Sequence, residues 1–140
     1  MLYNSSILKK NIHFIRAELE PLKARVQYEN TLKEIDEFDV VLLSMGEDGH
    51  IASLFPKHEY PEVQNVIVEH NSPKPPKERI SMSYKRLNKS QNVFKIVSGR
   101  SKQSIVGSLL QGESLPFCMV SGKIEKIFIH CSAISGECKK

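Results

Sequence analysis

Several features are scarce or missing in this sequence, and each absence argues against a class of protein. There are only three cysteines, Cys118, Cys131 and Cys138, with no C-x-x-C pair, which argues against a disulfide framework or a zinc site and favours a reducing compartment. No apolar run approaches the roughly 20 residues that a membrane helix needs. The opening MLYNSSILKK does not have the order of a secretory signal. We therefore expect a cytoplasmic protein with no membrane contact.

The charge pattern gives little support for nucleic-acid binding. The formal net charge is +4 and the pI about 9.0, with the densest basic group in SPKPPKERISMSYKRLNKS. That group has no helix-turn-helix pattern and no aromatic residues interleaved on a basic strand. We expect no nucleic-acid partner, because a mild basic bias suits small anionic ligands equally well.

What is present fits one globular domain over residues 1–140. Hydrophobic residues make up 40% of the sequence and charged residues 26%, as in folded proteins. The length of 140 residues lies within the range of a single domain, roughly 100–150 residues.

Apolar spacing predicts helices that alternate with strands. Ala24, Tyr28, Leu32 and Ile35 recur at helical intervals, which predicts a helix over residues 19–35. The nearly continuous apolar run Phe38–Leu43 predicts a strand buried on both faces. Further strands are predicted at Val66–Val68, RISMS, NVFKIVS, FCMVS and KIFIHCS, and helical segments at YKRLNKS and at GRSKQSIVGSLLQG, which Gly112 ends. This alternation predicts a layered α/β fold with a parallel sheet.

The most unusual stretch is VVLLSMGEDGHIASLFP, residues 40–56, which joins a predicted strand to what we expect to be a short helix. In open α/β sheets ligands bind beyond the carboxyl ends of strands, where this turn lies. Gly46 and Gly49 let the backbone bend and let a ligand approach. A histidine imidazole titrates near neutrality, so His50 suits a general base, and Asp48 is placed to orient it. Taken alone, the pair is also explained by Asp48 capping the helix beside an ordinary histidine.

A second candidate site lies in VSGRSKQS. Gly99 permits a turn, and Arg100 and Lys102 fall at the start of the next predicted helix, where cations oppose the helix dipole. Cations are favoured there when they help backbone N–H groups to hold an anion, although a solvated surface pair explains them equally well. Arg79, after a proline-rich loop, is a third candidate cation. Basic positions and a histidine near strand ends suggest a small phosphorylated substrate.

Residues 42–56, LLSMGEDGHIASLFP, resemble the signature of 6-phosphogluconolactonases, L-L-G-x-G-x-D-G-H-x-A-S-L-F-P. SPKPPKERISMS resembles the family segment P-K-P-P-x-x-R-I-[ST], VSGRSKQSIVGSLLQG resembles V-x-G-x-x-K, and VQYENTL resembles the Y-E-x-x-L helix. The related glucosamine-6-phosphate deaminases continue the D-G-H core with I-A-F-N-E-P, so residues 53–56, SLFP, favour the lactonases. The resemblance covers nearly the whole chain in order.

The resemblance implies hydrolysis of 6-phospho-D-glucono-1,5-lactone to 6-phosphogluconate in the pentose phosphate pathway. The implied site comprises His50 as the general base, Asp48 as its support, Gly46 and Gly49 as room for the sugar phosphate, and Arg79 and Lys102 as phosphate ligands. No metal or organic cofactor is implied, because an ester carbonyl needs only an activated water and oxyanion stabilisation. The implied fold is a Rossmann-like parallel sheet with helices on both faces.

Two departures from the family pattern matter. Ser44 replaces the first glycine of the signature, which would shift the turn if the backbone there needed positive φ. The family's S-G-G-S-T-P phosphate loop and D-E-R segment do not occur in the sequence. We therefore expect a partial domain, incomplete on its N-terminal side, that either pairs with a segment carrying those elements or self-associates.

Two other functions remain open. A non-catalytic protein that binds a sugar phosphate or a partner chain is favoured by the missing phosphate loop and opposed by the intact D-G-H-x-A-S-L-F-P. A glucosamine-6-phosphate deaminase is less favoured, because the stretch Leu54-Phe55-Pro56 lacks the acid of the N-E-P motif.

Overall fold

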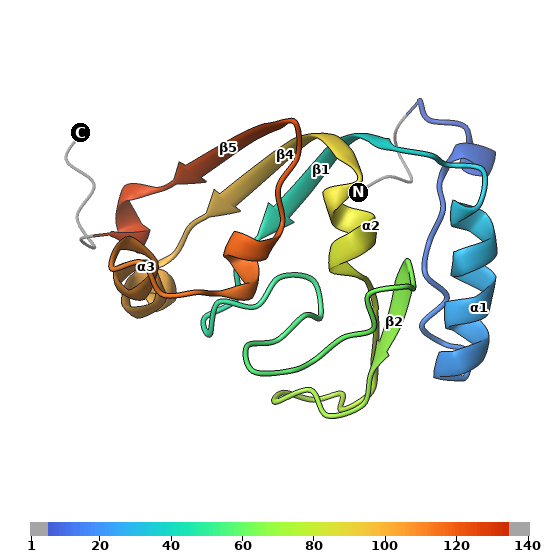
Figure 1. Cartoon of the computed structure of the whole chain (residues 1–140), viewed down its shortest axis with the longest axis horizontal. Helices are drawn as coiled ribbons and strands as arrows, with labels where there is room; N and C mark the ends of the chain where they lie inside the picture. Colours follow the sequence, from blue (N-terminus) through green and yellow to red (C-terminus); the bar gives the residue numbers. More distant parts are fainter. Residues whose placement is uncertain (1–5, 135–140) are drawn as a thin grey trace.

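The computed structural model describes residues 6–134, which form a parallel three-stranded sheet and a separate antiparallel strand pair (Figure 1). In chain order the elements are η2 (Lys9–Asn11), α1 (Pro21–Leu32), β1 (Phe38–Ser44), β2 (Val66–Glu69), β3 (Arg79–Met82), α2 (Tyr84–Asn88), β4 (Ser90–Val97), η3 (Arg100–Lys102), α3 (Gln103–Leu110), η4 (Pro116–Met119), β5 (Ile124–Ile129) and η5 (Cys131–Ala133), where η denotes a 3₁₀ helix. The predicted parallel sheet within an α/β fold is confirmed.

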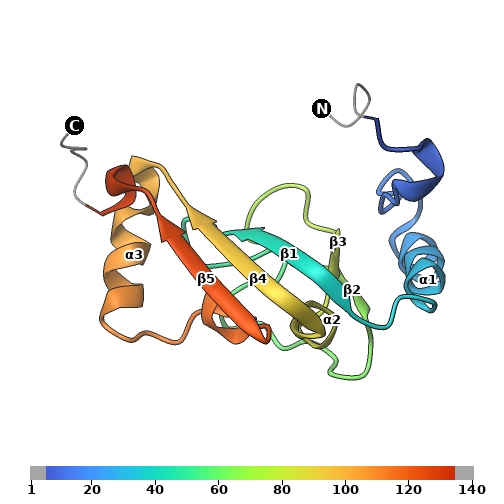
Figure 2. The same ribbon diagram turned by 90° about the horizontal axis from the view of Figure 1, so that it is seen from above.

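Helix α1 occupies the centre of the helix predicted over residues 19–35. Pro21 begins it, and the Glu20 carboxylate accepts hydrogen bonds from the amides of residues 22 and 23 at 3.1 and 2.9 Å. Its buried side chains are Ala24, Tyr28 and Leu32, as the apolar spacing predicted. The helix packs beside β2 and β3, away from β5 (Figure 1, Figure 2).

One face of the parallel sheet forms the main core. The strand order is β1-β4-β5, and the register places Val41 opposite Val93 and Leu43 opposite Lys95. Val41, Val93 and Val97 are buried against residues from the loops and from α2, α3 and η4. This packing fixes the carboxyl ends of β1 and β4 side by side, where the sequence analysis placed its candidate site.

The opposite face, which we call the open face, is exposed. By the register it carries Val40, Leu42, Phe94, Ile96, Ile124 and Phe128. Leu42 is 64% exposed and Phe128 53%. Figure 2 shows the three strands with none of the described helices lying over them. The prediction that Phe38–Leu43 is buried on both faces is therefore wrong for the described part of the chain, because only the core face of β1 is covered.

Two further predicted elements differ from the structure. RISMS forms β3, but it pairs antiparallel with β2 and stays outside the parallel sheet. The predicted strand FCMVS forms η4, which begins at Pro116 and turns the Phe117 ring into the core, where it is fully buried. Ser44 ends β1 opposite Ile96 and has no positive φ, so the turn does not require a glycine conformation at this position.

The structure also bears on the expectations about the cysteines and about membrane-spanning helices. The cysteine count and spacing predict no disulfide framework; Cys131 is nevertheless disulfide-bonded, Cys118 is a free, exposed thiol, and Cys138 lies outside the described residues. No helix among residues 6–134 has the length and apolar character to cross a membrane.

Candidate active site

The candidate site begins where β1 ends. After Ser44 the chain folds back on itself through bridges between Met45 and Ile51 and between Ile51 and Leu54. The Gly46 amide donates to the His50 carbonyl at 2.7 Å, and Gly49 adopts φ +85°, a conformation that favours glycine. The short helix predicted after His50 is therefore wrong, because these backbone bonds close a compact bridged turn instead.

Asp48 and His50 form a close pair inside this turn. The Nδ1 atom of His50 lies 2.5 Å from Oδ1 of Asp48, and the His50 amide donates to the same oxygen at 3.2 Å. Burial alone raises the pKa of Asp48, but the hydrogen bonds and charge of His50 outweigh it, so the pKa of this carboxyl is lowered. An ionised carboxylate only accepts hydrogen bonds, so Nδ1 carries a proton; in the neutral form of the imidazole, Nε2 then has the free lone pair.

Gly46 and Phe55 set the position of the imidazole. A Cβ added to Gly46 would lie 2.1 Å from Nδ1 of His50 and 2.2 Å from Cε1, so the ring occupies the space that any side chain would fill. The buried Phe55 ring lies 4.8 Å from the imidazole, centroid to centroid. From the sequence, Gly46 is expected to let a ligand approach; in the structure this glycine makes room for His50.

Lys102 lies next to the same turn, at the end of β4. Gly99 turns the chain with φ +105°, and Lys102 ends η3 directly before α3. The carboxylate of Glu47 is 3.2 Å from Nζ of Lys74, and its pKa is lowered by hydrogen bonds from Lys74 and Ser101 and by the charges of Lys74 and Lys102. Adjacent parallel strands thus bring this predicted cation beside the Asp48–His50 turn.

Arg79 reaches the site from β3. Its Nε and Nη2 atoms donate to the backbone carbonyls of residues 74–76 at 2.9–3.2 Å, which braces the proline-rich loop. Its Cζ atom lies 5.5 Å from the centre of the Phe55 ring. The structure therefore connects Arg79 to His50 through Phe55.

Three residues around this turn are not among those that the sequence predicts for the site. Lys74 pairs with Glu47, and Phe55 packs against His50. The carboxylate of Glu69 accepts a hydrogen bond from the Tyr60 hydroxyl, which in turn accepts one from the Phe55 amide. Phe55 stood inside the S-L-F-P motif and Lys74 inside S-P-K-P-P, so both signals were present but unassigned. Nothing in the local sequence marked Glu69.

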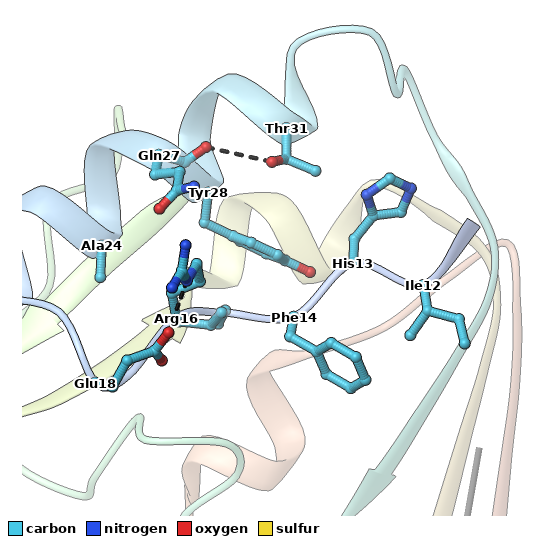
Figure 3. A pocket seen from close by; sticks show the side chains of 10 residues that line it. Ile12, His13, Phe14, Arg16, Glu18, Ala24, Gln27, Tyr28 and Thr31 are labelled. Atoms are coloured by element: carbon cyan, nitrogen blue, oxygen red, sulfur yellow. Dashed lines mark hydrogen bonds and ion pairs between the residues drawn. The ribbon is translucent and has the colours of Figure 1, made fainter. Parts of the chain in front are cut away.

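One cavity borders the site turn, and a second lies apart from it. One of about 430 Å³ runs between β1 and β3 and borders the site turn at Ala52 and Ser53. Another of about 470 Å³ lies between α1 and the extended segment 12–18, where Tyr28 projects from the helix toward the segment (Figure 3). The second cavity has none of the turn residues in its lining. Within residues 6–134, no group of three or more His, Cys, Asp or Glu side chains is arranged to hold a metal ion.

The family model of glucosamine-6-phosphate isomerases/6-phosphogluconolactonase matches residues 1–129. The chain belongs to this family. A probable 6-phosphogluconolactonase of Drosophila melanogaster is 42% identical to it over 102 residues, which cover 69% of this chain and 42% of the relative. The chloroplastic 6-phosphogluconolactonase 3 of Arabidopsis thaliana is 33% identical over 136 residues, covering 84% of this chain and 42% of the relative.

Among solved structures, the 6-phosphogluconolactonase of Thermotoga maritima superposes with a TM-score of 0.83 at 28% identity, covering 92% of this chain and 60% of that one. The chain therefore has the family's α/β fold and spans about half the length of the relatives that it matches.

Proposed function

We propose that this chain provides the general base of a 6-phosphogluconolactonase, which hydrolyses 6-phospho-D-glucono-1,5-lactone to 6-phosphogluconate in the pentose phosphate pathway. The observation that carries the proposal is the 2.5 Å contact between Nδ1 of His50 and Oδ1 of Asp48, at the carboxyl end of a parallel strand. The names of the Drosophila, Arabidopsis and Thermotoga relatives support the choice of substrate.

In the proposed reaction Nε2 of His50 takes a proton from a water molecule as that water attacks the lactone carbonyl. The negative charge of Asp48 stabilises the imidazolium that forms. The tetrahedral intermediate then collapses, the bond between the carbonyl carbon and the ring oxygen breaks, and Nε2 returns the proton to the ring oxygen. The step consumes one water and needs neither a metal nor an organic cofactor.

Arg79 and Lys102 are proposed to bind the substrate phosphate. Arg79 has Nη1 available, because its hydrogen bonds to described residues use Nε and Nη2. Lys102 lies close enough to Glu47 for its charge to lower the pKa of that carboxyl. Lys74, which pairs with Glu47 at 3.2 Å, adds a third cation beside this turn. Gly49 supplies the φ of +85° that the turn needs, and the buried Leu115 side chain lies 3.0 Å from where its Cβ would be.

The open face is proposed to bind a polypeptide that resembles the part of the relatives that this chain does not match. Exposed apolar side chains cover this face, and within residues 6–134 no strand pairs with the outer edge of β1. An unpaired edge beside an apolar surface is a template for an added strand. Self-association through the same face is the alternative. The cytoplasmic location stays a prediction.

The proposal is tested by lactone hydrolysis, measured above the spontaneous rate, for the chain alone and for the chain mixed with the N-terminal part of the Drosophila relative. We expect weak activity alone, higher activity in the mixture, and a roughly 10²–10⁴-fold loss on His50→Asn, as is typical of a lost general base. Unchanged turnover in the folded His50→Asn variant would remove His50 from the mechanism.

The non-catalytic alternative is favoured by one observation, the extent of the open face. It predicts that the chain binds 6-phosphogluconate or the added polypeptide without hydrolysing the lactone in any mixture. The deaminase alternative predicts release of ammonia from glucosamine 6-phosphate, which we do not expect, because Leu54-Phe55-Pro56 supplies no acid.

A further inference from the structure

Glu69 is a buried carboxylate that the proposed reaction does not use. It ends β2, and only 5% of the residue is exposed. Its Oε1 atom accepts from the Asn71 amide at 2.6 Å, and its Oε2 atom contacts Nδ1 of His58 at 2.8 Å. Oε2 also accepts from the Tyr60 hydroxyl at 2.7 Å. A buried charge with this many partners is fixed in place, because breaking any of these bonds leaves it uncompensated.

Tyr60 transmits this fixed position to the active-site turn. Its hydroxyl donates to Glu69 and accepts a hydrogen bond from the Phe55 amide at 2.8 Å. The backbone of Phe55 is thus tied to β2, although this strand begins 11 residues later in the sequence, at Val66. The pKa of Tyr60 is raised, first by burial and then by the neighbouring Glu69 carboxylate, so the hydroxyl keeps the proton that it donates.

Phe55 passes the constraint to His50. Its ring is buried and lies 4.8 Å from the imidazole. Since the imidazole also fills the space beside Gly46, a displacement of the Phe55 ring changes the packing that holds it. The chain of contacts therefore runs from Glu69 through Tyr60 and Phe55 to His50.

We infer that Glu69 and Tyr60 are positioning residues for His50: they hold Phe55 so that its ring keeps the imidazole aligned with Asp48. The inference deepens the proposed function and rests on it for the role of His50 in catalysis. The arrangement itself is a property of the fold and can be measured without substrate.

The test compares two tyrosine variants of this chain. Tyr60→Phe removes the hydroxyl that links Glu69 to Phe55. Tyr84→Phe is the matched control, because Tyr84 is also half-buried, lies 6.1 Å from Tyr60 ring to ring, and makes no hydrogen bond through its hydroxyl to a described residue. Imidazole ¹⁵N NMR at a pH where His50 is neutral distinguishes its Nδ1–H and Nε2–H tautomers.

We expect His50 in the unmodified chain to be the Nδ1–H tautomer. In Tyr60→Phe the ¹⁵N shifts of Nδ1 and Nε2 should move toward each other as the second tautomer is populated, whereas Tyr84→Phe should leave both unchanged. Glu69→Gln should produce the same change, with Glu78→Gln as its control, because the contact of Glu78 within residues 6–134 is an exposed one, with His70 at 3.2 Å. Identical His50 shifts in Tyr60→Phe and Tyr84→Phe, whatever their melting temperatures, would overturn the inference.

The activity of the mixture with the Drosophila segment separates this inference from the proposed function. Tyr60→Phe should lower kcat about tenfold and change KM by less than about twofold, because a misaligned base affects the chemical step. A His50 tautomer that responds to Tyr60→Phe in a mixture without lactonase activity would support the positioning role and refute the function. Lactonase activity that depends on His50 but not on Tyr60 would refute the positioning role alone.

Discussion

Gly46→Ala should disable the proposed base while leaving the fold intact. The added Cβ would lie 2.1 Å from Nδ1 of His50, 2.2 Å from Cε1 and 2.7 Å from Cγ, where real Cβ atoms stay beyond 3.0 Å. Gly46 has no positive φ, so alanine fits its backbone, and the three nearest atoms to the added Cβ all belong to the ring. The imidazole must move by roughly 1 Å or more, which breaks its 2.5 Å contact with Asp48.

The effect on stability and the effect on activity should differ sharply. The lost Asp48–His50 bond is partly exposed, so we expect a loss of about 1 kcal/mol in the free energy of unfolding. Activity of the mixture should fall by roughly 10²–10⁴-fold, as for loss of the base itself. The pKa of Asp48 should rise, because the hydrogen bonds from His50 that lower it are lost while burial still raises it.

Gly107→Ala is the matched control. A Cβ at Gly107 would meet no atom within 4 Å, and the residue lies inside α3. Alanine there should raise the free energy of unfolding by about 0.5–1 kcal/mol and leave the His50 resonances unchanged. If Gly46→Ala kept both the His50 tautomer and the full activity, the reasoning about the imidazole's position would be refuted.

Three other predictions follow from the same geometry. Lys102→Ala and Arg79→Ala should each weaken 6-phosphogluconate binding by roughly tenfold or more, measured by calorimetry. Only Arg79→Ala should also lower the melting temperature, since the Arg79 side chain braces the proline-rich loop. Equal losses of affinity for unphosphorylated gluconate would refute phosphate binding. Burial raises the pKa of Glu69, but its hydrogen bonds outweigh burial and hold this pKa below the ordinary value of 4.5. As the pH falls below 4.5, the unfolded chain therefore binds a proton at Glu69 before the folded chain does, and the stability that this carboxylate contributes is lost. Denaturation curves of Glu69→Gln should show a weaker acid dependence than those of Glu78→Gln, and parallel curves would contradict the assignment. The chain alone should self-associate, as measured by sedimentation. Leu42→Lys on the open face should reduce the self-association and block activation by the Drosophila segment. A monomeric unmodified chain with ordinary turnover would overturn the partner proposal.

The sequence by itself determined the local features of this protein. Ala24, Tyr28 and Leu32 line the buried face of α1, and the run before Ser44 forms β1, because both follow from the spacing of apolar residues along a short segment. The pairing of Asp48 with His50 was also predictable, since a single residue separates them and the turn keeps them close. Gly112 ends α3 with φ +83°, as a glycine after a helix does.

Tertiary structure alone decided the properties that depend on distant residues. Apolar spacing does not say what covers a strand, so it did not predict that Leu42 is exposed while Val41 is buried. Alternation predicts a strand but not its partner, so the antiparallel pairing of β3 with β2 was missed. The link from Glu69 to Phe55 arises because the fold places the end of β2 behind the site turn, where a buried carboxylate must find hydrogen-bond donors from whichever segment lies there.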